Sequence, residues 1–77
     1  MGATLNKDEM RRRLGANIQA CRISLDLTQQ QLADMTGFSR SYIAEIESGK
    51  RNASVNNLFR IAQGLEVNLF NLFQGVD

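Results

Sequence analysis

The stretch that decides the fold is residues 28–50, which read TQQQLADMTGFSRSYIAEIESGK. Thr28 followed by Gln31 is a capping-box pattern for the start of a helix, and Ser39 is an N-cap candidate for another. Gly37 lies between them, and glycine adopts the left-handed conformation that ends many helices without steric cost. The stretch therefore predicts two short helices joined by a tight turn built on glycine.

Helix signals continue on both sides of this stretch. Apolar residues before it recur at i, i+4, i+8, i+11 and i+15, as on one face of a long helix: Met10, Leu14, Ile18, Cys21 and Leu25. Asn6 with Glu9 is a capping pattern for that helix, Ser54 caps a fourth, and Asn68 precedes a short apolar fifth segment, LFNLF. With no proline in the chain and no strand-like alternation, we expect an all-α, compact five-helix domain spanning residues 1–77.

The composition is that of a small globular domain. Of 77 residues, 43% are hydrophobic and 22% charged, and the single cysteine excludes an intramolecular disulfide. Histidine is absent, which removes the usual general base and most zinc sites, so we expect no enzyme, no metal and no cofactor. No apolar run approaches the roughly 20 residues that span a bilayer, so we expect a cytoplasmic protein.

The third predicted helix has two chemically different sides. At about 100° per residue, Ile43 and Ile46 fall on one side. The other side carries Arg40, Ser41, Ala44 and Glu45. These residue types match the donors, acceptors and methyl groups of base edges in the major groove. Any mixed polar face contains such groups, however, and the same pattern fits an ordinary helical hairpin in a structural bundle.

The run LTQQQLADMTGFSRSYIAEIESGKRNASVNNLFRIAQGLEV, residues 27–67, resembles the helix-turn-helix of Cro/C1-type (XRE-like) regulators. The resemblance covers about residues 14–73 and implies a lambda-repressor-like DNA-binding domain with its helix-turn-helix at about 28–48, formed by helices two and three. It rests on these positions: Thr28, Gln29, Leu32, Ala33, Gly37, Ser39, Ile43, Ile46, Glu47, Gly49, Arg51, Leu58, Ile61, Ala62 and Leu65. The chain also resembles, more narrowly, the controller proteins of restriction-modification systems, and phage and prophage repressors are close as well.

The resemblance implies a role for individual residues. The base contacts would come from Arg40, Ser41, Ala44 and Glu45. The DNA backbone contacts would come from Gln29, Tyr42, Ser48, Lys50 and Arg51. It further implies a structural ion pair between Arg22 and Glu47, which would fix helix three against helix one.

The C-terminal segment, residues 65–77, concentrates apolar side chains that a five-residue helix cannot all turn inward. We expect a dimer interface formed by Val67, Leu69, Phe70 and Phe73. A two-fold dimer would present two copies of helix three to successive major grooves, about 34 Å apart.

These observations favour a sequence-specific transcriptional regulator, a repressor or controller protein, that binds a palindromic operator on double-stranded DNA as a homodimer. The alternative is an antitoxin-like or other protein-interaction module in which DNA binding is secondary. RNA polymerase or another protein is a further candidate partner.

Overall fold

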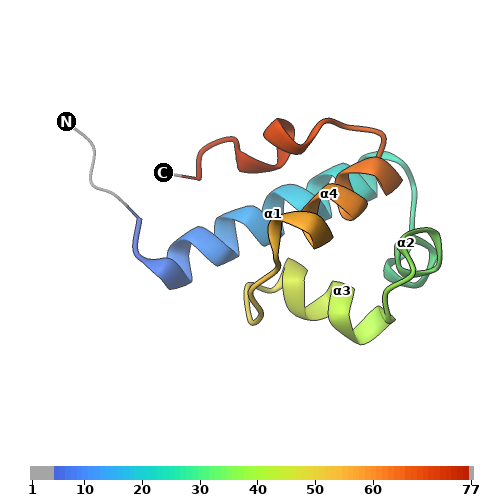
Figure 1. The fold of residues 1–77 in the computed structure, drawn as a ribbon, viewed down its shortest axis with the longest axis horizontal. Helices are drawn as coiled ribbons and strands as arrows, with labels where there is room; N and C mark the ends of the chain where they lie inside the picture. The colour runs from blue at the N-terminus through green and yellow to red at the C-terminus, as the bar shows by residue number, and fades with distance from the viewer. Residues whose placement is uncertain (1–4, 77) are drawn as a thin grey trace.

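Four α-helices and one 3₁₀ helix form the described part of the chain, residues 5–76, in the computed structural model (Figure 1). They are α1 (Lys7–Ser24), α2 (Gln29–Thr36), α3 (Arg40–Glu47), α4 (Val55–Gly64) and the 3₁₀ helix η1 (Leu69–Phe73). Residues 1–4 and 77, at the two ends of the predicted domain, lie outside the described residues. The described residues contain no strand, as expected, and no helix among them is long and apolar enough to span a membrane.

The prediction of a fifth α-helix is wrong, because LFNLF forms a 3₁₀ helix instead. Asn68 caps it, and its backbone carbonyl accepts from the backbone N–H of Asn71 at 3.1 Å. A five-residue segment has little room for i to i+4 hydrogen bonds, and 3₁₀ geometry is common in pieces this short.

The start of each α-helix follows the sequence signals closely. Asn6 with Glu9, and Thr28 with Gln31, both form reciprocal capping boxes. The hydroxyl groups of Ser39 and Ser54 accept from backbone N–H groups at the starts of α3 and α4. Each bond satisfies a backbone donor that the helix itself cannot pair, which sets where the chain enters the helix.

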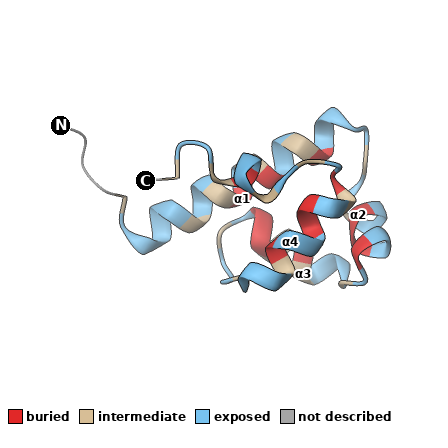
Figure 2. Cartoon of the chain, turned by 45° about the horizontal axis from the view of Figure 1, so that its top comes forward, coloured by how far each residue is buried: buried red, intermediate tan, exposed pale blue. Residues whose placement is uncertain are grey.

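The first helix, α1, runs along the long axis of the molecule (Figure 1), and α3 and η1 pack against it. α3 packs against α1 and α2, while α4 contacts α2 and η1. The C-terminal segment returns over α1 on the side away from α3 (Figure 1). The buried faces of the helices point toward one another (Figure 2) and form a core of Ile18, Leu32, Ala33, Ile43, Ile46, Leu58, Ile61, Ala62, Leu65 and Leu72.

The apolar stripe predicted for α1 is buried only in its middle. Ile18 is fully buried, but Met10 and Leu25 at the two ends are 38% and 41% exposed. Helical periodicity identifies the face that can pack, but the neighbouring elements decide how much of that face is covered.

Gly15 allows a close approach between the backbones of α1 and α3. A Cβ atom at this position would lie 2.3 Å from the carbonyl oxygen of Ile46 and 2.4 Å from that of Glu47. Both neighbours are backbone atoms at the C-terminal end of α3, so neither could move aside without shifting the helix. The absence of a side chain at Gly15 therefore sets the spacing between these two helices.

Replacing Gly15 with alanine should destabilise the fold by about 1–3 kcal/mol, the usual cost of overpacking a tight site. This sign is opposite to that of helix propensity, by which alanine is favoured over glycine by up to about 1 kcal/mol. Urea denaturation of G15A measures the effect, and Ala20→Gly on the exposed side of α1 measures the propensity difference alone. A G15A protein more stable than the parent would show that α1 and α3 are not held this closely.

Candidate nucleic-acid interface

α3 places its apolar side inward and its polar side toward solvent. Ile43 is fully buried and Ile46 is 3% exposed, as the sequence predicts. Arg40 and Ser41 in the first turn are exposed. Ala44 and Glu45, one turn further on, are partly buried. The four residues predicted to contact bases thus share one accessible face.

An ion pair between Arg22 of α1 and Glu47 of α3 fixes the far end of that helix. The guanidinium donates from Nε to Oε2 at 2.7 Å and from Nη2 to Oε1 at 3.0 Å, a bidentate arrangement. The two side chains are only 10% and 2% exposed. Arg22 also donates to the carbonyl of Leu27, and Gln29 donates to Glu47 at 3.0 Å. The network therefore joins α1, α3 and the start of α2.

A second ion pair joins two residues that were assigned to different DNA contacts. Arg51 Nε donates to Glu45 Oε1 at 2.8 Å, and the two side chains are about half exposed, at 51% and 45%. Glu45, predicted to read a base, and Arg51, predicted to contact the backbone, therefore bind each other. Since a solvent-exposed pair of this kind contributes little to stability, it can open at small cost.

The remaining predicted backbone contacts lie around the same face but differ in their surroundings. Gln29 accepts a long hydrogen bond from Arg40 at 3.4 Å, which places the start of α2 beside the start of α3. Tyr42 is partly buried, and its hydroxyl accepts from Asn57 of α4 at 2.9 Å. Ser48 is exposed, and its hydroxyl donates to the carbonyl of Glu45 at 3.1 Å. Lys50 is exposed.

Sequence reasoning missed two residues of α4 that reach toward this face. Asn57 donates to Tyr42, and Arg60 donates to the backbone carbonyl of Thr36, the last residue of α2. Although Arg60 is exposed, its guanidinium is held by this hydrogen bond. The three-residue spacing of Asn57 and Arg60 puts them on one face of α4, but nothing in the sequence shows that this face lies over the α2–α3 turn.

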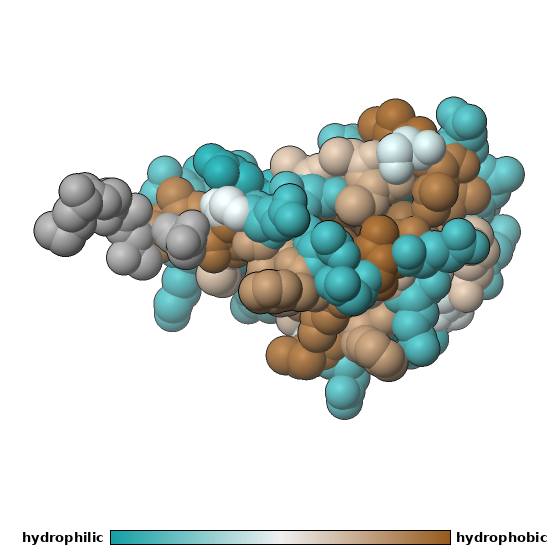
Figure 3. Space-filling model, turned by 90° about the horizontal axis from the view of Figure 1, so that it is seen from above, coloured by the Kyte–Doolittle hydropathy of each residue, from teal (hydrophilic) through white to brown (hydrophobic). Residues whose placement is uncertain are grey.

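The predicted dimer residues are unequally exposed. Phe70 is 84% exposed, the most exposed of the large hydrophobic side chains in the described residues, and its neighbour Leu72, which was not among the predicted dimer residues, is fully buried. Val67, Leu69 and Phe73 are partly buried and pack against the core. Figure 3 views the side of the molecule that carries the C-terminal segment, where hydrophobic patches alternate with hydrophilic side chains.

Comparison with known proteins shows to which family the chain belongs. The chain matches the helix-turn-helix family over residues 18–72, most of its length. The chain belongs to the helix-turn-helix family. The predicted resemblance to Cro/C1-type regulators is therefore confirmed.

Individual relatives agree with this assignment. The chain is 35% identical to the uncharacterized HTH-type transcriptional regulator y4dJ of Sinorhizobium fredii, over 90% of each chain. It superposes on the restriction-modification controller C.AhdI of Aeromonas hydrophila with a TM-score of 0.81, at 31% identity, covering 84% of this chain and 97% of that one. For the controller C.Esp1396I, solved as a tetramer with its natural 35 base-pair operator, the TM-score is 0.78 at 30% identity, covering 87% and 88%.

Replacing Arg22 with methionine should lower the free energy of unfolding by about 3–5 kcal/mol, because Glu47 would remain buried without its partner. The double variant Arg22→Met/Glu47→Leu should recover most of that loss, since it leaves no unpaired charge. Urea denaturation measures both.

The matched control is Arg51→Met, which breaks the half-exposed pair with Glu45 and should cost less than about 1 kcal/mol. Equal losses for Arg22→Met and Arg51→Met would contradict the structural role assigned to the buried pair.

Proposed function

We propose that this protein is a sequence-specific transcriptional regulator that binds a palindromic operator as a homodimer. The observation that carries the proposal is the orientation of α3, whose buried isoleucines leave Arg40 and Ser41 exposed side by side. Belonging to the helix-turn-helix family supports it, as does the solved complex of the related controller C.Esp1396I with operator DNA.

We assign the helix-turn-helix itself to α2 and α3, with α3 in the major groove. The two helices pack closely, and the turn between them is built on Gly37 in the left-handed conformation, with φ of 79°. Gln29 at the N-terminal end of α2 lies beside Arg40, so one duplex can be contacted from both helices. Backbone N–H groups at a helix start are well suited to a phosphate.

Within α3 the residues take different roles. Arg40 can donate two hydrogen bonds to guanine, Ser41 can donate or accept, and Ala44 offers a methyl group to thymine. Glu45 can accept from a cytosine amino group, and opening of its pair with Arg51 frees the guanidinium for a phosphate. The base contact of Glu45 and the phosphate contact of Arg51 are thus linked through their ion pair.

We further propose that residues 65–76 form the dimer interface, with Phe70 at its centre. A phenylalanine that is 84% exposed on a domain of this size is costly to leave in water, and a two-fold axis through it would bury two copies at once. The partly buried Val67, Leu69 and Phe73 would then form the rim of the interface rather than its core.

Selection of bound sites from a random duplex pool tests the proposal. We expect a consensus with two-fold symmetry and half-sites about one helical turn apart. An antitoxin-like role predicts instead a stoichiometric protein partner in pull-downs and no enriched sequence at physiological salt.

Replacing Arg40 with alanine should cost about 1–3 kcal/mol of binding to the selected duplex, with little effect on random DNA. Replacing Lys50 with alanine should weaken both duplexes alike and reduce the slope of log affinity against log salt by about one. Fluorescence anisotropy titrations at several salt concentrations measure both. If each variant loses the same affinity on both duplexes, the division into base and backbone contacts is wrong.

Replacing Phe70 with serine should raise the dimer dissociation constant at least about tenfold, because the buried ring is lost from both protomers. Sedimentation equilibrium measures the change, and the fold should survive because the side chain is 84% exposed. Ile23→Ser, which removes a 57% exposed apolar side chain from α1, is the control. An unchanged constant for F70S would move the interface elsewhere.

A further inference from the structure

A stack of side chains connects α4 to the first turn of α3. The guanidinium of Arg60 lies over the ring of Phe38, 4.3 Å from its centroid. Phe38 in turn contacts the ring of Tyr42, with centroids 4.7 Å apart and planes inclined by 37°. The guanidinium of Arg51 lies over the Tyr42 ring, 5.2 Å from its centroid. Each of the two contacting rings thus has a cation over it, an arrangement that the ring quadrupoles favour.

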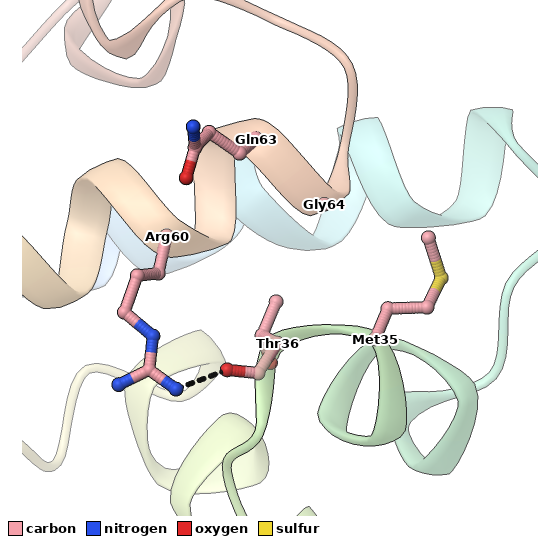
Figure 4. Close-up of a pocket in the computed structure, with 5 residues that line it drawn as sticks. All are labelled: Met35, Thr36, Arg60, Gln63 and Gly64. Carbon is pink, nitrogen blue, oxygen red and sulfur yellow. Dashed lines mark hydrogen bonds between the residues drawn. The ribbon is translucent and has the colours of Figure 1, made fainter.

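Two hydrogen bonds from α4 hold this stack in place, one from Arg60 and one from Asn57. Arg60 donates to the carbonyl of Thr36, a C-terminal carbonyl of α2 (Figure 4). In Figure 4 the Arg60 side chain extends from α4 down to this carbonyl at the turn between α2 and α3. Three residues earlier on α4, Asn57 donates to the Tyr42 hydroxyl at 2.9 Å. One face of α4 therefore holds the turn and the start of α3 at two points.

The first turn of α3 has few other restraints: beside the Ser39 cap and the long Arg40–Gln29 hydrogen bond, the contacts that hold the helix lie further along it. α3 has only eight residues, too few to be a stable helix by itself. Ile43 is buried in its middle, and Ile46, the contact of Gly15 and the Arg22 ion pair hold its C-terminal end. Arg40, by contrast, projects from the exposed first turn.

We propose that Arg60 is a positioning residue: through the ring of Phe38 it holds the first turn of α3 in the orientation from which that turn reads DNA. This inference rests on the proposed function. Binding sites are effective when the residues that make contacts are held closely in place by a supporting shell. Loosening the stack should therefore weaken base reading, while charge-based binding to any duplex continues.

A first experiment, without DNA, measures amide hydrogen exchange at Tyr42 and Ile43. Their N–H groups bond to the hydroxyl and carbonyl of Ser39 and so report on the first turn of α3. Arg60→Ala should accelerate exchange at these two amides about three- to tenfold. Arg60→Lys, which retains a cation over the ring, should restore most of the protection. Unchanged exchange in Arg60→Ala would overturn the proposal whatever the protein binds.

The control for this experiment is Arg13→Ala. Arg13 also donates to a backbone carbonyl, that of Gly75 at 3.1 Å, so the variant removes the same charge and a similar bond from another part of the molecule. It should leave exchange at Tyr42 and Ile43 as in the parent. Acceleration equal to that of Arg60→Ala would show a general loss of stability and overturn the proposal.

A second experiment compares binding to the selected duplex and to random DNA. Arg60→Ala should reduce the ratio of the two affinities about three- to tenfold with an unchanged salt slope. Phe38→Leu, which keeps an apolar side chain but removes the ring face, should do the same. The double variant should be little worse than either single one, because both remove one interaction.

Two results would overturn the proposal in this second experiment. Equal loss on both duplexes with a salt slope lower by about one would make Arg60 a direct phosphate contact. Additive losses in the double variant would show that Arg60 and Phe38 act independently. If the parent protein itself does not discriminate between the duplexes, the proposed function fails, and the exchange experiment still shows whether Arg60 holds α3.

Discussion

The structure depends on how α3 is docked onto α1. Gly15 lets the two backbones come close enough that the last carbonyls of α3 lie against α1. At the same place Arg22 and Glu47 form a buried, bidentate ion pair. A well-packed apolar pair could be as stable, but the fork geometry of a guanidinium and a carboxylate also fixes rotation and register. Since the rotation of α3 decides which side faces solvent, this docking determines the accessible face of the helix.

The other elements complete this restraint. α2 and α3 have eight residues each, so their order comes from packing and capping rather than from intrinsic helix stability. Gln29 connects the start of α2 to Glu47, and residues of α4 hold the turn and the start of α3. A short helix restrained at both ends and in the middle can present side chains at defined positions, which reading a base sequence requires.

The sequence predicted the local features of this fold well and the distances between elements poorly. The capping boxes at Asn6 and Thr28, the left-handed Gly37 and the burial of Ile43 follow from patterns within a few residues, and the structure has all of them. Three other features were missed: the close approach at Gly15, the pairing of Glu45 with Arg51 and the 3₁₀ form of residues 69–73. The first two depend on how far apart two segments lie in space, which a helical wheel does not contain.

The same limit applies to the candidate site. Periodicity correctly grouped Arg40, Ser41, Ala44 and Glu45 on one side, because one helix carries them all. It could not show that Glu45 already has a partner, nor that Arg60 of α4 reaches the turn, because both contacts join different elements.

The most direct test of this account is a crystal structure of the protein bound to its selected operator duplex. The account predicts that Arg40 and Ser41 lie within hydrogen-bonding distance of base edges in the major groove, while Ile43 and Ile46 remain buried. A complex in which α3 faces away from the DNA, or in which those isoleucines turn toward solvent, would contradict it.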